Sequence, residues 1–177
     1  MIGKTIYLRA VEPNDAELFY QWENDYDIWQ YSRRIIPVSH FTLNQYMETA
    51  NQDIFQTRQQ RLVIVDKETD VPVGAVDLFD FDPIESRAAV GILIYDETER
   101  RKGFATEAIR LLETYAFETL RLHQLYCDVA EDNDASIKLF SGRGFIHTCT
   151  KKDWLTDGHL WKDELLFQKI NPEHRSE

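Results

Sequence analysis

Residues 88–108 read Ala-Ala-Val-Gly-Ile-Leu-Ile-Tyr-Asp-Glu-Thr-Glu-Arg-Arg-Lys-Gly-Phe-Ala-Thr-Glu-Ala. The opening apolar run predicts a strand that is covered on both faces and central in its sheet. Three cations, at positions 100–102, then precede Gly103 and an apolar series at helical spacing. That series is Ala105, Ala108, Ile109, Leu112, Tyr115 and Ala116. The stretch therefore predicts a buried strand that leads through a cationic glycine loop into a packed helix.

The loop over residues 100–106 has the character of a phosphate-binding loop. The first amides of a helix lack intrahelical partners and carry roughly half a positive charge, so they attract anions. Gly103 has no Cβ, which lets the backbone come close to such a group. A solvated basic turn with an ordinary turn glycine explains the same residues equally well at this level.

A second segment, residues 124–145, reads as a strand, an Asx-rich turn and a short helix that ends at glycine. Asn133 or Asp134 can cap the start of this helix, and Gly142 or Gly144 can take the left-handed conformation at its end. Ordinary helix capping accounts for these residues without any function.

Together the two segments resemble the GNAT superfamily of acetyl-CoA-dependent N-acetyltransferases. The first is similar to that family's pyrophosphate signature, Arg/Gln-x-x-Gly-x-Gly/Ala, and the second to its pattern Asn-x-x-Ser/Ala-x-x-Leu-Tyr/Phe-x-x-x-Gly-Phe. The matching residues are Arg100, Gly103 and Ala105, then Asn133, Ser136, Leu139, Phe140, Gly144 and Phe145. Their order and separation of about thirty residues make the pair more specific than either motif alone. Residues 6–16 resemble the branch that contains polyamine and ribosomal-protein N-terminal acetyltransferases.

The bulk composition bounds the class of protein. A length of 177 residues, with 43% hydrophobic and 12% aromatic residues, predicts one folded domain over 1–177, with a frayed tail at 171–177. The net charge of −11 disfavours nucleic acid as a partner and favours a small cationic substrate. Simple solubility explains the same charge.

Location and metal content follow from what the sequence lacks. The chain has no apolar run near the ~20 residues that span a bilayer and no signal-peptide pattern, so we expect a cytoplasmic protein without a membrane partner. Cys127 and Cys149 lack metal or disulfide spacing, and we expect both to be reduced packing residues. The five histidines are scattered, and no metal is expected.

The remaining pattern predicts an α/β (α+β) fold with strands interleaved among helices. Capping-box patterns predict helix starts at Asn14 and at Thr42, and Asp157-Gly158 predicts a two-residue hairpin. The other expected strands lie at 5–10, 62–66, 71–79, 145–150 and 165–170. The resemblance implies a three-layer sandwich whose mixed sheet of about seven strands, with about four helices, is splayed between its fourth and fifth strands. The pantetheine arm of acetyl-CoA would lie in that split.

Acetyl transfer to an amine needs a proton acceptor, because an amine with a pKa of ~10.4 is mostly protonated at pH 7. The first candidate is Asp77, on the strand after Gly74, where the resemblance places an acidic residue that faces the acceptor. Asp80 and Glu23 are weaker candidates. An ordinary carboxylate at a strand edge or facing a loop is the competing explanation of Asp77.

The resemblance also implies a set of residues that bind the coenzyme. A backbone amide near Ile94 would polarise the thioester carbonyl, the last residues of the central strand would pair with the pantetheine amides, and Leu139 would help line the thioester pocket. The implied coenzyme-binding residues are Leu93, Ile94, Tyr95, Arg100, Arg101, Lys102, Gly103, Phe104, Ala105, Thr106, Asn133, Ser136 and Phe140.

The sequence departs from the family pattern in two places. Many members carry a tyrosine at position 140 that protonates the leaving thiolate; Phe140 cannot, and Ser141, Tyr126 or Tyr95 can substitute or the acid is dispensable. Arg33 and Arg34 stand where polyamine-acetylating relatives carry glutamates, and guanidinium groups facing the acceptor would repel a polycation.

These residues leave three functions open. The first is acetylation of a small primary amine, with a polyamine such as spermidine foremost. The second is acetylation of protein N-termini, as in ribosomal-protein acetyltransferases. The third is a non-catalytic acyl-CoA-binding module. The resemblance further implies self-association, since relatives form dimers or larger rings.

Overall fold

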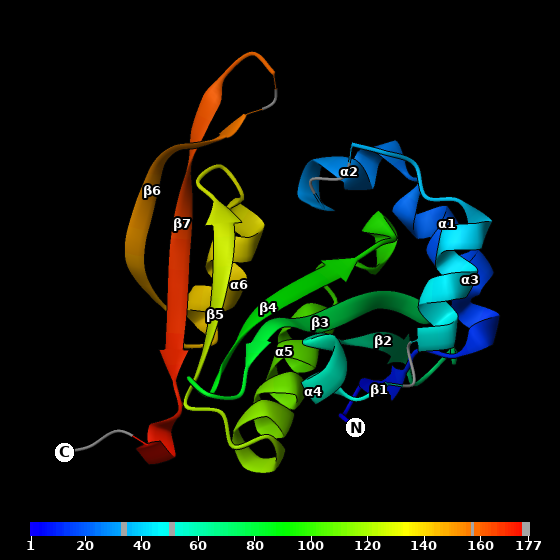
Figure 1. Ribbon diagram of the computed structural model, residues 1–177, viewed down its shortest axis with the longest axis horizontal. Helices are drawn as coiled ribbons and strands as arrows, with labels where there is room; N and C mark the ends of the chain where they lie inside the picture. The colour runs from blue at the N-terminus through cyan, green and yellow to red at the C-terminus, as the bar shows by residue number, and fades with distance from the viewer. Residues whose placement is uncertain (33–34, 50–51, 157, 175–177) are drawn as a thin grey trace.

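A computed structural model describes residues 1–32, 35–49, 52–156 and 158–174. Its centre is one mixed sheet with the strand order β1-β2-β3-β4-β5-β7-β6, and helices cover both faces (Figure 1). The strands are β1 (Ile6–Ala10), β2 (Gln60–Asp66), β3 (Pro72–Asp82), β4 (Arg87–Ile94), β5 (Gln124–Ala130), β6 (Ile146–Thr156) and β7 (Trp161–Ile170). The α/β class and the seven strands expected from the sequence are confirmed.

The sheet separates two hydrophobic clusters, because side chains alternate between the faces of a strand. One cluster lies under α5 (Phe104–Thr114) and α6 (Asp134–Gly142) and includes Val76 and Leu78 of β3. The other lies under α1 (Ala16–Glu23) and α3 (His40–Thr49) and includes Ala75 of the same strand. Ala75 and Asp77 in the middle of β3 therefore face α1, and Val76 and Leu78 face α5.

The sheet is split in its middle. β4 and β5 are parallel neighbours, but their register covers only residues 87–89 of β4 against 124–126 of β5. Past Ala89 and Tyr126 the two strands diverge, as Figure 1 shows, while β3 continues to pair with β4 up to Ile94. The predicted splay between the fourth and fifth strands is thus confirmed, and it leaves one edge of β4 without a strand partner among the described residues.

Several local expectations are corrected. α1 begins at Ala16, after a 3-10 turn at Pro13–Asp15, because the Asp15 carboxylate accepts hydrogen bonds from the amide of Glu12 and from Arg9. α3 begins at His40, two residues before Thr42, and the Ser39 hydroxyl accepts from the Thr42 amide. Three further elements were not expected, namely α2 (Tyr26–Ser32), α4 (Ile54–Thr57) and a π-helical turn at Tyr115–Thr119.

The carboxyl-terminal part also differs from expectation. β6 and β7 are longer than predicted, and the pair Thr156–Trp161 leaves four residues between the strands rather than two. Residue 157 of the expected Asp-Gly turn lies outside the described residues. Asn171 is buried and its amide donates to the His123 carbonyl, so the chain is held through the 3-10 turn at Pro172–His174. Cys127 is buried as expected, whereas Cys149 is exposed on the edge strand β6.

None of the helices in the described ranges is both long enough and apolar enough to cross a membrane.

Candidate active site

The predicted phosphate loop lies at the end of β4, where the split is widest (Figure 1). Gly103 caps α5 with a left-handed φ of 88°, and Arg101 is also left-handed, with φ of 64°. The first intrahelical bond of α5 runs from the Glu107 amide to the Gly103 carbonyl, so the amides of residues 104–106 precede the ladder and have no partner within it. Amides without intrahelical partners, next to a glycine whose Cβ position has no atom within 4 Å, are suited to an oxyanion.

Two of the three loop cations are engaged with neighbours of the loop itself. The Arg100 guanidinium donates to the Ile94 carbonyl at 3.1 Å and pairs with Glu97 at 2.9 Å. Lys102 pairs with Glu99 at 2.8 Å. Arg101 is exposed and has no ion pair within the described ranges. The loop thus offers chiefly backbone amides to an anion, while Arg100 ties the loop to β4.

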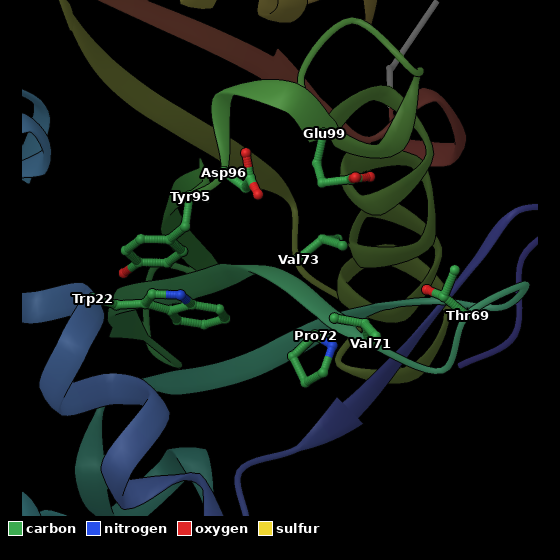
Figure 2. Close-up of a pocket in the computed structure, with 8 residues that line it drawn as sticks. All are labelled: Trp22, Thr69, Val71, Pro72, Val73, Tyr95, Asp96 and Glu99. Atoms are coloured by element: carbon green, nitrogen blue, oxygen red, sulfur yellow. The ribbon is translucent and has the colours of Figure 1, made fainter.

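Leu93 and Ile94 end β4, and Tyr95 follows them. The Tyr95 amide donates to the Val73 carbonyl of β3, and the side chains of these residues take different directions. Ile94 is buried in the α5 cluster. The Tyr95 ring instead turns toward α1 and stacks on Trp22, with ring centroids 3.9 Å apart. Figure 2 shows these two rings beside a shallow groove of about 310 Å³ that Asp96 and Glu99 also line. Tyr95 therefore contributes its ring to this groove, while its amide is bound to β3.

The second motif forms the start of α6 across the split. The Asn133 side chain accepts a hydrogen bond from the Ser136 amide at 3.1 Å, which confirms Asn133 as the helix cap. Gly144 closes the helix in a left-handed conformation, with φ of 81°. Phe140 is buried against Phe145 in the α5 cluster, so its ring packs in the core beneath β5.

Asp77 lies on the α1 face of β3, directly opposite Gly91 of β4, and both of its oxygens are bound by Arg61 of β2. The Arg61 Nε–Asp77 Oδ1 distance is 2.7 Å, and Arg61 Nη1 lies 2.8 Å from Glu23 Oε1 on α1. All three side chains are largely buried, with exposed fractions of 23% for Arg61, 15% for Asp77 and 8% for Glu23. The first and third candidate bases therefore share one guanidinium.

This ion-pair triad is an electrostatic unit. Burial opposes the charge of Arg61, but the carboxylates of Asp77 and Glu23 raise the pKa of Arg61 above its ordinary value. The Tyr46 hydroxyl of α3 lies in the same field, and burial raises the pKa of Tyr46. Sequence reasoning missed Arg61, because only the pairing of β2 with β3 places it opposite Asp77. Arg33 and Arg34 lie outside the described residues.

A second cluster of polar side chains lies on the α1 face of the sheet, on the β5 side of the split. Leu125, Cys127 and Val129 of β5 enter the α5 cluster, so Tyr126 and Asp128 point to the opposite face. Lys151 of β6 bridges Asp128 at 2.8 Å and Glu164 of β7 at 3.0 Å. Asp80, the other weaker candidate for the proton acceptor, is exposed near the end of β3. The face that would meet an acceptor is thus lined on both sides of the split by carboxylates.

The site thus combines a split between two parallel strands with a loop of helix N-terminal amides, which is suited to an anionic group. The family model for the acetyltransferase (GNAT) domain matches residues 5–146. The chain belongs to this family of N-acetyltransferases, whose members take the acetyl group from acetyl-CoA.

Two curated relatives match over most of their length. The chain is 28% identical to "Probable N-acetyltransferase YjcK" of Bacillus subtilis (strain 168), over 97% of each chain. It is also 28% identical to "Spermidine N(1)-acetyltransferase" of Vibrio cholerae, over 90% of this chain and 84% of the relative. A solved structure of the Vibrio cholerae spermidine N-acetyltransferase in complex with CoA and spermine superposes with a TM-score of 0.84 at 23% identity, covering 95% of this chain and 96% of the other.

Proposed function

We propose that the protein transfers an acetyl group from acetyl-CoA to a small primary amine, with spermidine-like polyamines the first class to test. The observation that carries the proposal is the split between β4 and β5 with the amide-rich loop at its wide end. The diphosphate of the coenzyme would bind residues 100–106, and its pantetheine amides would pair with the free edge of β4. The cap at Asn133, together with Ser136 and Phe140, would border the arm from the β5 side.

Two features support a cationic acceptor. The chain carries a net charge of −11, which attracts cations over long distances. On the acceptor face itself, Asp77 and Glu23 lie on one side of the split and are bridged by Arg61, and Asp128 and Glu164 lie on the other and are bridged by Lys151. The spermidine acetyltransferase of Vibrio cholerae is a relative over most of this chain.

Asp77 remains the proposed proton acceptor. An ionised carboxylate has about four lone-pair positions, and Arg61 takes one on each oxygen of Asp77. The remaining positions leave room for a water molecule that relays the proton of the amine. Asp77 lies opposite Gly91, where a Cβ would come within 3.3 Å of the Phe79 ring and 3.9 Å of Asp77 Oδ2, so glycine avoids crowding the carboxylate.

The test is a panel of spermidine, spermine, short diamines and peptides with free N-termini, each with acetyl-CoA and monitored by release of free thiol. We expect turnover with the polyamines and none with the peptides. Turnover on peptides alone would favour protein N-terminal acetylation. Heat of CoA binding without turnover on any amine would favour the non-catalytic module and overturn the proposal.

The proton acceptor is tested with Asp77→Asn, which keeps one acceptor for Arg61. We expect kcat to fall by about 10²-fold or more, as is usual when a general base is removed. Asp80→Asn, on the same strand but exposed, is the matched variant and should keep kcat within about twofold. The reverse pattern would move the role to Asp80, and unchanged turnover in both would remove the role from this strand.

A further inference from the structure

At the closed end of the split, where β4 and β5 still pair, β5 carries the hydroxyl group of Tyr126. Tyr126 is the last residue of β5 that pairs with β4, opposite Ala89. Its neighbours Leu125 and Cys127 point into the α5 cluster, which directs the Tyr126 side chain to the acceptor face. The side chain is half-buried, and within the described ranges its hydroxyl has no hydrogen-bond partner.

The inference rests on the proposed function, with the pantetheine arm running back along β4, which brings the coenzyme sulfur to this end of the split rather than near Ile94. The diphosphate would be held at the wide end, after Ile94. From Ile94 back to Ala89 the strand spans roughly 16 Å, given ~3.3 Å per residue. A pantetheine arm that runs along β4 therefore carries its thioester away from the loop and toward Tyr126.

The other hydroxyls considered from the sequence lie elsewhere. The Tyr95 ring is stacked on Trp22 at the opposite end of β4 (Figure 2). Ser141 is exposed in the last turn of α6, the helix that packs on the other face of the sheet. Phe140 has no hydroxyl and is buried. Among these residues, Tyr126 lies both at the closed end of the split and on the acceptor face of the sheet.

We propose that the Tyr126 hydroxyl donates a hydrogen bond to the coenzyme sulfur as the thioester bond breaks. The amine nitrogen forms a bond to the carbonyl carbon, the C–S bond breaks, and its electron pair moves to the sulfur. The proton lost by the amine reaches the sulfur through Asp77 and solvent, so the products are the N-acetyl amine and the free thiol. Tyr126 stabilises the charge that develops on the sulfur.

The environment of Tyr126 keeps its hydroxyl protonated, so that it can donate a hydrogen bond. Burial raises the pKa of Tyr126, the carboxylates of Asp80 and Asp128 raise it further, and Arg87 and Lys151 oppose them. The residue opposite on β7 is Gln168, which is neutral. A thiol has a pKa of ~8.5 and a phenol ~10, so complete proton transfer from Tyr126 to the thiolate is uphill. Hydrogen bonding without transfer avoids that cost.

The experiment compares the wild-type protein with Tyr126→Phe, and it uses CoA as the probe. The pKa of the bound CoA thiol is followed by the ultraviolet absorbance of the thiolate as the pH is raised. A charge-assisted hydrogen bond lowers a thiol pKa, so we expect the pKa of bound CoA to be about one unit higher in Tyr126→Phe. We expect kcat to fall about tenfold, with KM for acetyl-CoA within about twofold.

Tyr115→Phe is the matched control, because Tyr115 is also half-buried with its pKa raised by burial, but lies beyond α5 on the far side of the sheet. It should change neither quantity. An unchanged thiol pKa in Tyr126→Phe, with CoA still bound by calorimetry, would overturn the role of Tyr126 and leave the proposed function standing. No binding of CoA to the wild-type protein would overturn both.

Discussion

At the scale of single residues, Arg61 binds two of the three candidate proton acceptors, although its local sequence gives no sign of this role. It contacts Glu23 of α1 and Asp77 of β3 at once, with hydrogen-bond distances of 2.8 and 2.7 Å. It also lies over the Phe19 ring, 5.6 Å from its centroid. Only a planar guanidinium presents donors in the fixed directions that this double contact uses.

We therefore predict that Arg61→Met lowers the free energy of unfolding by about 3–5 kcal/mol, because it leaves two buried carboxylates without their shared cation. Arg61→Lys keeps the positive charge but loses the several fixed donors of the guanidinium, and should recover part of that stability. With the amine substrate, Arg61→Lys should lower kcat more than it raises KM, since it releases Asp77 from its position. Chemical denaturation and steady-state kinetics measure both. Equal stability of the two variants would contradict the prediction.

At the scale of elements, Glu107 joins the first turn of α5 to the beginning of β1. Its carboxylate accepts hydrogen bonds from the backbone amides of Lys4 and Thr5 and from the Thr5 hydroxyl. Partial burial opposes its charge, but these hydrogen bonds lower the pKa of Glu107 from 4.5 to about 2. The helix that follows the proposed phosphate loop is thereby anchored at its N-terminal end.

The sign of the pH effect follows from the lowered pKa. The stabilisation is fully present above pH 4.5 and is lost as the pH falls toward 2. We predict that Glu107→Gln costs about 1–2 kcal/mol of unfolding free energy at pH 7 and weakens the dependence of stability on pH between 5 and 2. Denaturant melts across this range provide the measurement. Glu118→Gln, at an exposed position, should alter neither, and a Glu107→Gln melt that matches the wild type at pH 7 would refute the anchor.

At the scale of the whole molecule, the two halves of the split sheet are tied together beneath it. Glu113 of α5, with an exposed fraction of 6%, pairs with Lys169 of β7 at 2.8 Å and with Arg143 just after α6. Lys169 also donates to the Arg143 carbonyl. Because β4 and β5 pair over three residues only, this cluster supplies a connection that the sheet itself lacks.

We predict that Lys169→Met lowers the unfolding free energy by about 2–4 kcal/mol, since a buried charge cluster loses a partner. The double variant with Glu113→Gln should be less destabilised than the sum of the two single variants, because the residues interact directly. A double-mutant cycle by denaturation decides this. Strict additivity would show that the cluster does not act as a unit.

Prediction from the sequence succeeded where the signal was local and failed where it depended on pairing. The apolar run before Gly103 was readable from neighbouring residues, and the structure has it as β4. The helix cap and the left-handed glycine were each narrowed to two residues, from which the structure selects Asn133 and Gly144. The strand partner of Asp77 was not readable, so a residue expected to be an available base is found bound to Arg61. The lengths of β6 and β7 were likewise underestimated, because most of β6 is exposed and lacks the apolar run of a central strand.

The amino-acid sequence alone therefore determined the order of elements, the two motifs and, through them, the family. Local propensities, helix caps and the small residues of a loop depend on residues a few positions apart, so they can be recognised directly in the sequence. Only the tertiary structure decided which residues of β4 and β5 pair before the sheet splits and which cation neutralises the buried carboxylates. Those features arise from contacts between residues that are far apart in the chain, whose geometry no local pattern encodes.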